Sequence, residues 1–358
     1  MPASLLYAFY LASSWFWCIG AFLPVLLLRD YGWVSLVVFT LANLVGAAAF
    51  GWVMNRQRQQ AFLVTHRSLL KLFSQVTLAF QLFFVAWIST LVGWWLLLVM
   101  LLLVGLFYQA NRIITWAAVG VFLLSMLLWA SYLPMNFQFA SGTLQPGGWH
   151  TLLPLVLGFA FSPYLDLTFH RAFQQSPHPK LSFTLGFGGF FFLLLMFVFF
   201  YSQTLMDLIE GKSLDVALLW PLVAFIVMQT AFTSALHLKE MQRFSYTSWR
   251  PLLLLGGLYL LLLIFVLNAL VNESLPWLDL LFAEVIYKGF LFFYGLVVPL
   301  YLLLGKNHWR FWVTLLVATP AYSLGFLVGG DLLFLLSLSM AWIAVMVMLS
   351  KVERDYGI

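Results

Sequence analysis

The sequence predicts an all-α polytopic membrane protein with about twelve transmembrane helices and both termini in the cytoplasm. Of its 358 residues, 64% are hydrophobic and only 8% are charged, far below the roughly 25% of charged residues usual in soluble domains. Because a spanning helix needs about 20 apolar residues, this length leaves almost no chain for domains outside the bilayer. The function is therefore expected within the membrane.

Apolar runs bounded by charge, glycine or proline predict the individual spans. They cover residues 4–28, 32–54, 69–92, 94–110, 114–134, 149–172, 181–203, 215–238, 251–271, 277–304, 309–328 and 331–350. The third and fourth are divided at Gly93, because one span over 69–110 would be too long. The first run lacks a basic segment and a cleavage site, so we expect a retained helix rather than a signal peptide.

Basic residues support this count, since Lys and Arg collect in the short cytoplasmic loops of membrane proteins. Fourteen of the 17 lie in alternate connections or in the C-terminal tail: Arg56, Arg58, Arg67, Lys71, Arg112, Arg171, Lys180, Lys239, Arg243, Arg250, Lys306, Arg310, Lys351 and Arg354. This segregation predicts twelve spans with both termini in the cytoplasm. We expect a multi-pass protein of a bacterial inner membrane. It also accounts for the net charge of +5 without nucleic-acid binding.

Two short matches predict an internal repeat. Residues 21–28 and 160–167 share the pattern A-F-x-P-x-L-x-L, and F-T-L recurs at residues 39–41 and 183–185. Because five helices separate the paired segments, the two halves would have inverted topology. We expect a first repeat over 1–140, a second over 141–304, and two additional helices with a short cytoplasmic tail over 305–358.

Ser162 and Pro163 predict a helix start near the middle of the sixth span. Proline suits the first position of a helix after a Ser cap, and Asp166 would then lie in the first turn. Non-helical backbone at that depth is tolerated only where it is buried in protein or lines a cavity. The stretch from Gly20 to Pro24 predicts a matching break in the first span. The alternative is two proline kinks in intact helices.

With these paired breaks, the sequence resembles the LeuT-type fold of the amino-acid, polyamine and organocation transporter superfamily, with the sodium/solute symporters as the nearest group. The resemblance covers residues 1–304 as five plus five inverted helices. In that family the first and sixth helices are unwound at mid-membrane and hold the substrate between them. It therefore implies substrate contacts at Gly20, Ala21, Phe22, Phe159, Phe161 and Ser162.

Hydroxyl residues on the eighth span bear on the coupling ion. Sodium-coupled members of the family place two adjacent hydroxyl residues on the eighth helix, near carbonyls of the broken first helix. The resemblance thus implies a Na⁺ site at Thr230, Thr233 and Ser234, and hydroxyl and carbonyl oxygens suit a hard cation. The alternative is that these small polar side chains pack helices together.

Three ionisable residues, Asp166, Glu284 and Lys288, lie within predicted spans, where a charge costs on the order of 3 kcal/mol. Glu284 and Lys288 are spaced to neutralise each other on one helical face, or could form an outer gate as the resemblance implies. Asp166 could bind a cation, an amine or a proton, or could stabilise the helix start. The six histidines are expected at span ends.

We expect secondary active transport of a small organic solute by alternating access, coupled to Na⁺ or H⁺. The sequence contains no Walker-type loop and no hydrolase motif, so no enzyme activity is expected. The single cysteine excludes a cysteine metal cluster, and no cofactor other than Na⁺ is expected. One alternative is a non-transporting receptor or an accessory subunit with partner membrane subunits. Another is a polytopic transferase built on Asp166, His170 and Arg171.

Overall fold

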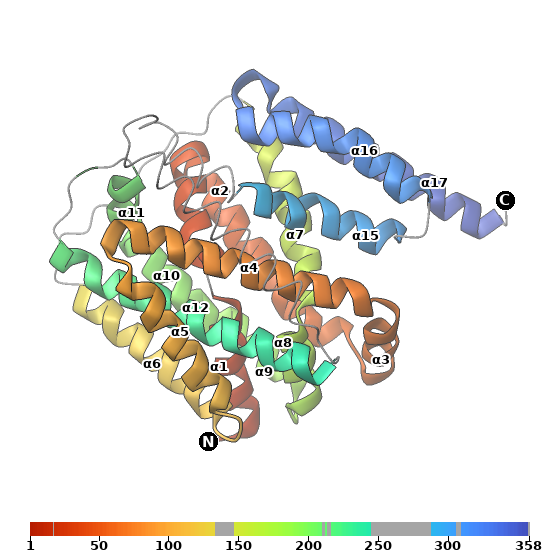
Figure 1. The fold of residues 1–358 in the computed structure, drawn as a ribbon. Helices are drawn as coiled ribbons and strands as arrows, with labels where there is room; N and C mark the ends of the chain where they lie inside the picture. The colour runs from red at the N-terminus through yellow and green to blue at the C-terminus, as the bar shows by residue number, and fades with distance from the viewer. Residues whose placement is uncertain are drawn as a thin grey trace. The chain divides into compact units, whose positions relative to one another are not determined.

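The computed structural model describes residues 1–16, 18–132, 147–209, 212, 216–244, 288–305 and 309–356. Of these residues, 92% are helical and none lies in a strand (Figure 1). The helical class agrees with the long apolar runs, which exceed the length of a typical strand. The predicted ninth span, 251–271, and the tenth up to residue 287 lie outside the described residues.

Six described helices are long and apolar enough to cross a membrane: Tyr31–Val53, Arg67–Ser89, Ile114–Ser131, Pro179–Phe200, Leu219–Phe244 and Gly330–Lys351. A seventh span results if Gly148–Leu165 and Leu167–Gln175 are the two parts of one broken span. Trp95–Gln109 and Lys288–Leu304 are shorter apolar helices. The chain is therefore an all-α, multi-pass membrane protein.

The described residues form two compact units. Unit 1 takes residues within Met1–Leu26, Ala47–Ala140 and Tyr164–Leu280, and unit 2 takes those within Leu27–Gly46, Ser141–Pro163 and Leu281–Ile358. Each unit combines segments that are distant in the sequence. The predicted division at residues 140 and 304 follows chain order instead, and it remains a prediction.

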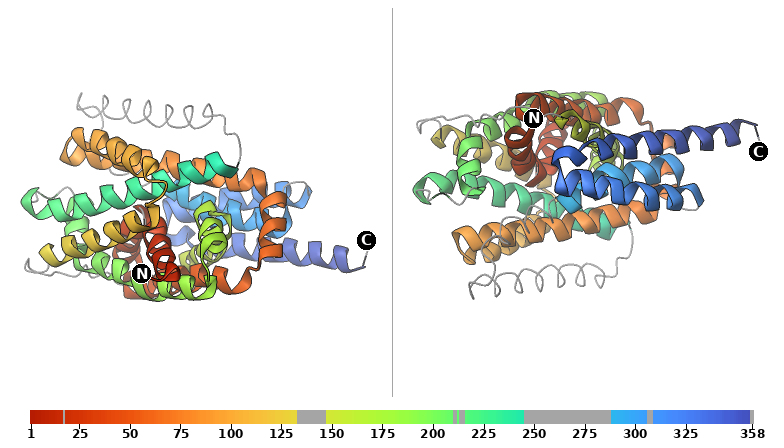
Figure 2. Two further views of the ribbon diagram at one scale, coloured as in Figure 1. Left: turned by 90° about the horizontal axis from the view of Figure 1, so that it is seen from below. Right: turned by 90° about the horizontal axis from the view of Figure 1, so that it is seen from above.

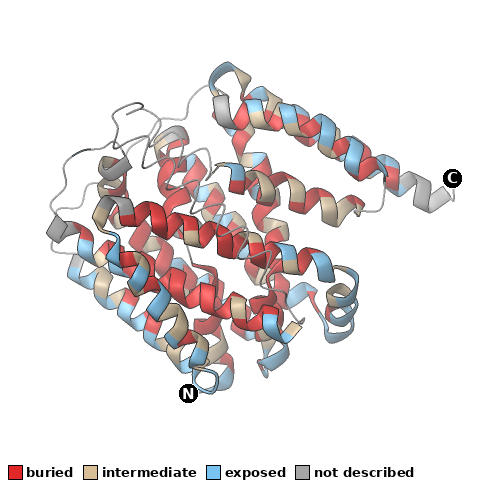
Figure 3. Ribbon diagram, viewed as in Figure 1, coloured by how far each residue is buried: buried red, intermediate tan, exposed pale blue. Residues whose placement is uncertain are grey.

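In unit 1 the central helix is α12 (Val216–Phe244), which packs against α4 (Arg67–Val92), α5 (Trp95–Gln109), α6 (Ile114–Tyr132), α1 (Ala3–Trp15) and α8 (Leu167–Gln175) (Figure 1). The most apolar window of α12 is 83% buried and that of α4 is 78% buried, against 28% for α6 (Figure 3). A helix surrounded by protein can carry polar side chains that lipid would exclude. The polar groups of the candidate site accordingly lie mainly on α12 and α4.

The connections of unit 1 follow local sequence rules. The turn predicted at Gly93 is present: α4 ends before it, its φ is 150°, and α5 begins at Trp95. Asn55 caps the short helix α3 (Arg56–Thr65) by accepting a hydrogen bond of 2.8 Å from the Arg58 amide, as Asn does at helix starts. Pro179 opens α9 (Pro179–Leu185), where its missing N–H is not needed.

After α9, the chain continues through the π-helix η3 (Gly186–Phe191), α10 (Phe192–Phe200) and α11 (Ser202–Ile209). Helix α1 packs against α9 and η3. A Cβ at Gly186 would lie 3.0 Å from the Ala8 carbonyl oxygen, so glycine permits this close approach of two helices. Close approach through small residues is usual between membrane helices.

Unit 2 contains η1 (Gly148–Thr151), α7 (Leu152–Phe161), η4 (Phe293–Val297), α15 (Val298–Leu304), α16 (Trp309–Ser323), η5 (Leu324–Val328), η6 (Gly330–Leu332) and α17 (Phe334–Tyr356). It also holds the middle of α2 (Cys18–Val53), in which Gly32 has φ 71° and interrupts the helix. Helix α7 packs against η4 and α15, and α16 lies along α17 in both views of Figure 2.

Candidate functional site

The first helix break lies at Phe16, between α1 and α2. Phe16 has φ −84° and ψ 82°, so the helix that ends at Trp15 does not continue into the one that starts at Cys18. The break was predicted at Gly20 to Pro24 and lies about one turn earlier. Gly20, Ala21, Phe22 and Pro24 are helical residues of α2. A proline removes only one helical hydrogen bond, and here the helix continues past it.

Gly20 nevertheless contributes to this break. A Cβ at Gly20 would lie 3.1 Å from the Phe16 ring. The absence of a side chain at Gly20 therefore leaves the space that the buried Phe16 ring occupies.

Helix α12 supplies donors for the carbonyl groups that the first break leaves without helical partners. Thr233 Oγ1 donates a hydrogen bond to the Ser13 carbonyl oxygen at 3.2 Å. In the amide orientation that satisfies its neighbours, Gln229 donates to the carbonyl oxygens of Ser13 and Phe16, each at 3.2 Å, and accepts from the Ser125 hydroxyl at 2.9 Å. All five residues are buried.

The second break lies at Asp166, between the 3₁₀ helix η2 (Ser162–Leu165) and α8. Asp166 has φ −80° and ψ 112°, and its Oδ1 accepts a hydrogen bond of 2.7 Å from the Thr168 amide. It is thus the N-cap of α8, a role that Asp fills well. The helix start was predicted at Ser162–Pro163 and occurs four residues later, so Asp166 precedes the first turn rather than lying in it.

The two breaks meet within unit 1. Thr168 Oγ1 lies 3.3 Å from Ser14 Oγ and donates a hydrogen bond to it, which joins the first turn of α8 to the last turn of α1. The rings of Trp15 and Phe169 pack beside this bond, with centroids 5.0 Å apart. The end of α1 and the start of α8 are therefore in direct contact, so a displacement of one helix end acts on the position of the other.

A buried acid and base face each other next to this junction. Asp166 Oδ2 lies 3.8 Å from His237 Nε2, and the two side chains are 1% and 0% exposed. Neither of these two atoms has a hydrogen-bond partner among the described residues. The other ring nitrogen of His237, Nδ1, lies 3.3 Å from Ser74 Oγ of α4. The pair thus consists of two ionisable groups enclosed by protein.

His237 was not among the predicted site residues, because all six histidines were expected at span ends. The signal that could have found it is helical spacing: Gln229, Thr233 and His237 recur every four residues and share one face of α12. That face is the one turned toward α1 and α8.

The three predicted ion ligands on α12 do not share one partner. Thr233 bonds to α1 through Ser13, whereas Ser234 Oγ donates to Gln81 Oε1 of α4 at 2.5 Å. The Thr230 hydroxyl is buried and has no hydrogen-bond partner among the described residues. The described part of the chain also contains no group of three or more His, Cys, Asp or Glu residues that could hold a metal ion.

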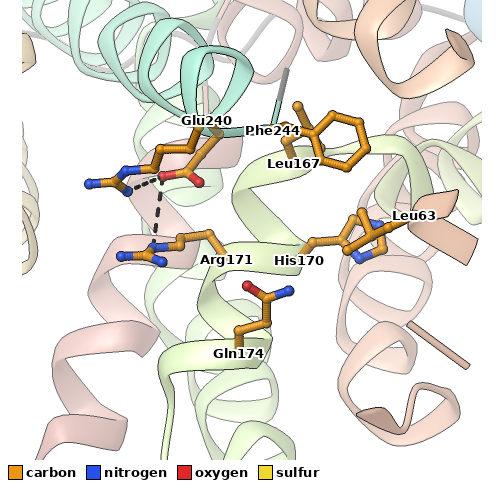
Figure 4. A pocket seen from close by; sticks show the side chains of 8 residues that line it. Leu63, Leu167, His170, Arg171, Gln174, Glu240 and Phe244 are labelled. Carbon is orange, nitrogen blue, oxygen red and sulfur yellow. Dashed lines mark hydrogen bonds and ion pairs between the residues drawn. The ribbon is translucent and has the colours of Figure 1, made fainter. Parts of the chain in front are cut away.

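A cavity of about 260 Å³ lies beside α8 and the C-terminal end of α12 (Figure 4). Its lining consists of Leu63, Leu167, His170, Arg171, Gln174, Glu240, Arg243 and Phe244. Glu240 accepts a hydrogen bond of 2.6 Å from Arg243 and lies 3.9 Å from Arg171 Nε. The Glu240 carboxylate therefore lies close to the guanidinium groups of both Arg243 and Arg171 at this cavity.

His170 is buried too, but its ring has a structural role. Its Nε2 lies 2.8 Å from the Tyr164 carbonyl oxygen, which can only accept, and Nδ1 lies 3.2 Å from Gln59 Nε2. Both ring nitrogens are therefore satisfied in one neutral tautomer. This arrangement offers no free base and does not support the transferase hypothesis on Asp166, His170 and Arg171.

Glu240 also lines a second cavity, of about 100 Å³. Tyr10, Arg112, Arg171 and Lys239 contribute to its lining. The Tyr10 hydroxyl and the Lys239 ammonium are buried, without hydrogen-bond partners among the described residues.

The chain was compared with protein-family models, with curated proteins and with solved structures. None of them matches it.

The predicted substrate residues divide between the two units. In unit 1, Phe22 packs against Phe84 and Trp87, with ring centroids 5.8 and 5.2 Å away. In unit 2, Phe159 packs edge-on against Phe39 at 5.0 Å, Ser162 Oγ donates to the Gly158 carbonyl at 2.5 Å, and Phe161 is half-buried. Their role in binding a solute remains a prediction.

The predicted pair on the tenth span is described only in part. Lys288 is half-buried in the helix Lys288–Leu304, and its ammonium lies 5.8 Å from the Phe326 ring centroid. Glu284 lies outside the described residues. The proposed gate or neutral pair therefore remains a prediction.

Proposed function

We propose that this protein is a secondary active transporter of a small organic solute, driven by a Na⁺ or H⁺ gradient and working by alternating access. The proposal includes twelve spans in a bacterial inner membrane, an inverted five-plus-five repeat and a LeuT-type fold. The substrate would bind beside the two helix breaks, at the residues that the family resemblance implies.

The observation that carries this proposal is the contact between the two breaks. Free peptide groups inside a bilayer are expensive unless protein or a cavity satisfies them. Here both breaks fall in long apolar segments, and Thr168 of one bonds to Ser14 of the other. Broken helices whose ends meet are the usual way in which secondary transporters bind ions and solutes at mid-membrane.

The polar groups beside the two breaks favour the binding of a solute that is not an anion. The only described carboxylate at the junction is Asp166, and it is buried. A carboxylate at this position repels an anionic group and attracts an amine or a zwitterion. The hydroxyl and amide groups of Ser14, Thr168 and Gln229 can serve neutral polar solutes as well.

Uptake into proteoliposomes tests the proposal. Purified protein would be reconstituted and supplied with labelled amines, amino acids and neutral polar solutes, under an inward gradient of Na⁺ or of H⁺. We expect accumulation of at least one solute class above protein-free vesicles, reduced in T233V, which loosens the first break. The matched control is T65V, at an exposed threonine of α3.

Two results would contradict transport. Binding of a solute without accumulation or exchange would favour the receptor or accessory-subunit alternative. Equal uptake by T233V and by wild type would mean that the structure of the first break does not affect transport.

A further inference from the structure

We infer that Asp166 and His237 together bind the coupling ion, and that this ion is a proton. The inference rests on the proposed transport function and assigns the ion that drives it. Its basis is the geometry of two enclosed ionisable groups at the junction of the breaks.

The first step is the arrangement of atoms. Asp166 Oδ2 and His237 Nε2 face each other at 3.8 Å with no other partner among the described residues. A shift of about 1 Å would bring them to hydrogen-bond distance with one proton between them. The remaining atoms are fixed: Asp166 Oδ1 accepts from the Thr168 amide and His237 Nδ1 contacts Ser74. Because a hydroxyl both donates and accepts, Ser74 suits either protonation state of Nδ1.

The second step is charge. With one proton the pair is neutral overall, whether the proton resides on the imidazole or on the carboxyl group. Without it the pair carries one negative charge, and an enclosed charge without a counter-ion is strongly unfavourable. A protonated pair can therefore be sealed from water, as it is here, whereas a deprotonated pair needs hydration. This difference couples proton binding to occlusion of the site.

The third step is linkage to the helix breaks. Asp166 caps α8, and the same first turn bonds to Ser14 through Thr168. On α12, His237 lies one turn after Thr233, which bonds to Ser13. A change in the distance between Asp166 and His237 thus acts on both breaks at once.

The fourth step is a route to water. Ionisable groups of the helices around the pair lie one to two helical turns away along the chain, all toward the end of the bundle predicted to be cytoplasmic: Tyr7 and Tyr10 of α1, Lys71 of α4, His170 and Arg171 of α8, and Lys239 and Glu240 of α12. Tyr10 interacts electrostatically with both Asp166 and Glu240. It also lines the 100 Å³ cavity together with Glu240. A proton released from the pair would pass to water there, and one taken up on the outer side would come from water.

The geometry favours a proton over Na⁺. A hard cation needs several convergent oxygen ligands, but Thr233 and Ser234 are bonded to different helices. A proton needs only the two facing atoms that this site supplies.

Transport under separate gradients tests the assignment in the reconstituted full-length protein, with the solute found by the uptake screen. For one proton per solute, a gradient of about one pH unit should give about tenfold accumulation at equal Na⁺, since one pH unit is a tenfold ratio of proton concentrations. A Na⁺ gradient at equal pH should give none. In D166N and H237Q, uptake with and without the pH gradient should coincide, whereas the control variants D207N and H150Q should respond as wild type does.

Accumulation driven by Na⁺ alone, or proton-driven accumulation that persists in D166N, would overturn the assignment and leave the transport proposal intact.

A second measurement needs no solute and no transport. Infrared difference spectra of the protein in nanodiscs, taken between about pH 5 and about pH 9, should contain a titrating band of the pair: either a carboxylic acid band that D166N removes, or an imidazole band that H237Q removes. Wild-type spectra without such a titrating band would also overturn it. Failure of the transport proposal would instead appear as no uptake or exchange by wild type.

Discussion

The Ser13 carbonyl at the end of α1 allows a quantitative test of the first break, because two side chains of α12 donate to it. Thr233 approaches it at 3.2 Å and Gln229 also at 3.2 Å. The Thr233 hydroxyl has one hydrogen, which it can also give to the Gln229 carbonyl at 3.0 Å. Replacement of Thr233 by Val leaves Ser13 one donor, so we expect a loss of about 1 kcal/mol in the free energy of unfolding.

Replacement of Gln229 by Leu should have a larger effect. It also removes the donor of the buried Phe16 carbonyl, and an unsatisfied buried acceptor costs about 1–3 kcal/mol. In the double variant Ser13 loses both donors. Its destabilisation should exceed the sum of the two single effects by about 1 kcal/mol or more, because the second loss leaves that carbonyl unsatisfied as well.

The assay is reversible unfolding in mixed detergent micelles, followed by circular dichroism and tryptophan fluorescence. T65V, at an exposed threonine, should stay within about 0.5 kcal/mol of wild type. If the two single effects add to within about 0.5 kcal/mol, then Thr233 and Gln229 do not share the Ser13 carbonyl, and this account of the first break is wrong.

The remaining predictions concern close helix contacts, a turn and a surface ion pair. G46A should destabilise by about 1–3 kcal/mol, because a Cβ there would lie 2.7 Å from the Phe159 carbonyl oxygen; its control G105A, with nothing within 4 Å of the added Cβ, should stabilise by about 0.5–1 kcal/mol in the same assay. G93A should destabilise by about 1–3 kcal/mol through backbone strain at its φ of 150°; wild-type stability would contradict the turn. Burial would raise the pKa of Asp207, but hydrogen bonds from Lys212 and Gln203 outweigh it and hold that pKa below its usual value. Because the folded pKa is the lower one, protection of α11 from hydrogen exchange should be constant above about pH 4 and fall below it, and D207N should remove this dependence.

Features governed by nearby residues were predicted well. The helical class, the turn at Gly93 and a break in the sixth span follow from apolar runs, glycine and capping groups. Each of these acts within about four residues of chain. Asp166 was identified as a helix-start residue for the same reason, although it is the cap and not a member of the first turn.

The position of the first break was predicted less well. The repeated pattern at residues 21–28 and 160–167 overlaps the second break but not the first, so it does not align the two. Phe16 interrupts its helix where Gln229 and Thr233 satisfy the freed carbonyls. These donors are more than two hundred residues away in the chain, and no local pattern indicates them.

The sequence by itself determined that this protein is a bundle of membrane helices, because hydrophobicity and helix capping depend on composition and on close neighbours in the chain. Only the tertiary structure decided which polar residues meet. It joined Asp166 to His237 and Ser14 to Thr168, because buried polar groups must find partners on whichever helices pack against them. Helix packing, and not chain order, selects those partners.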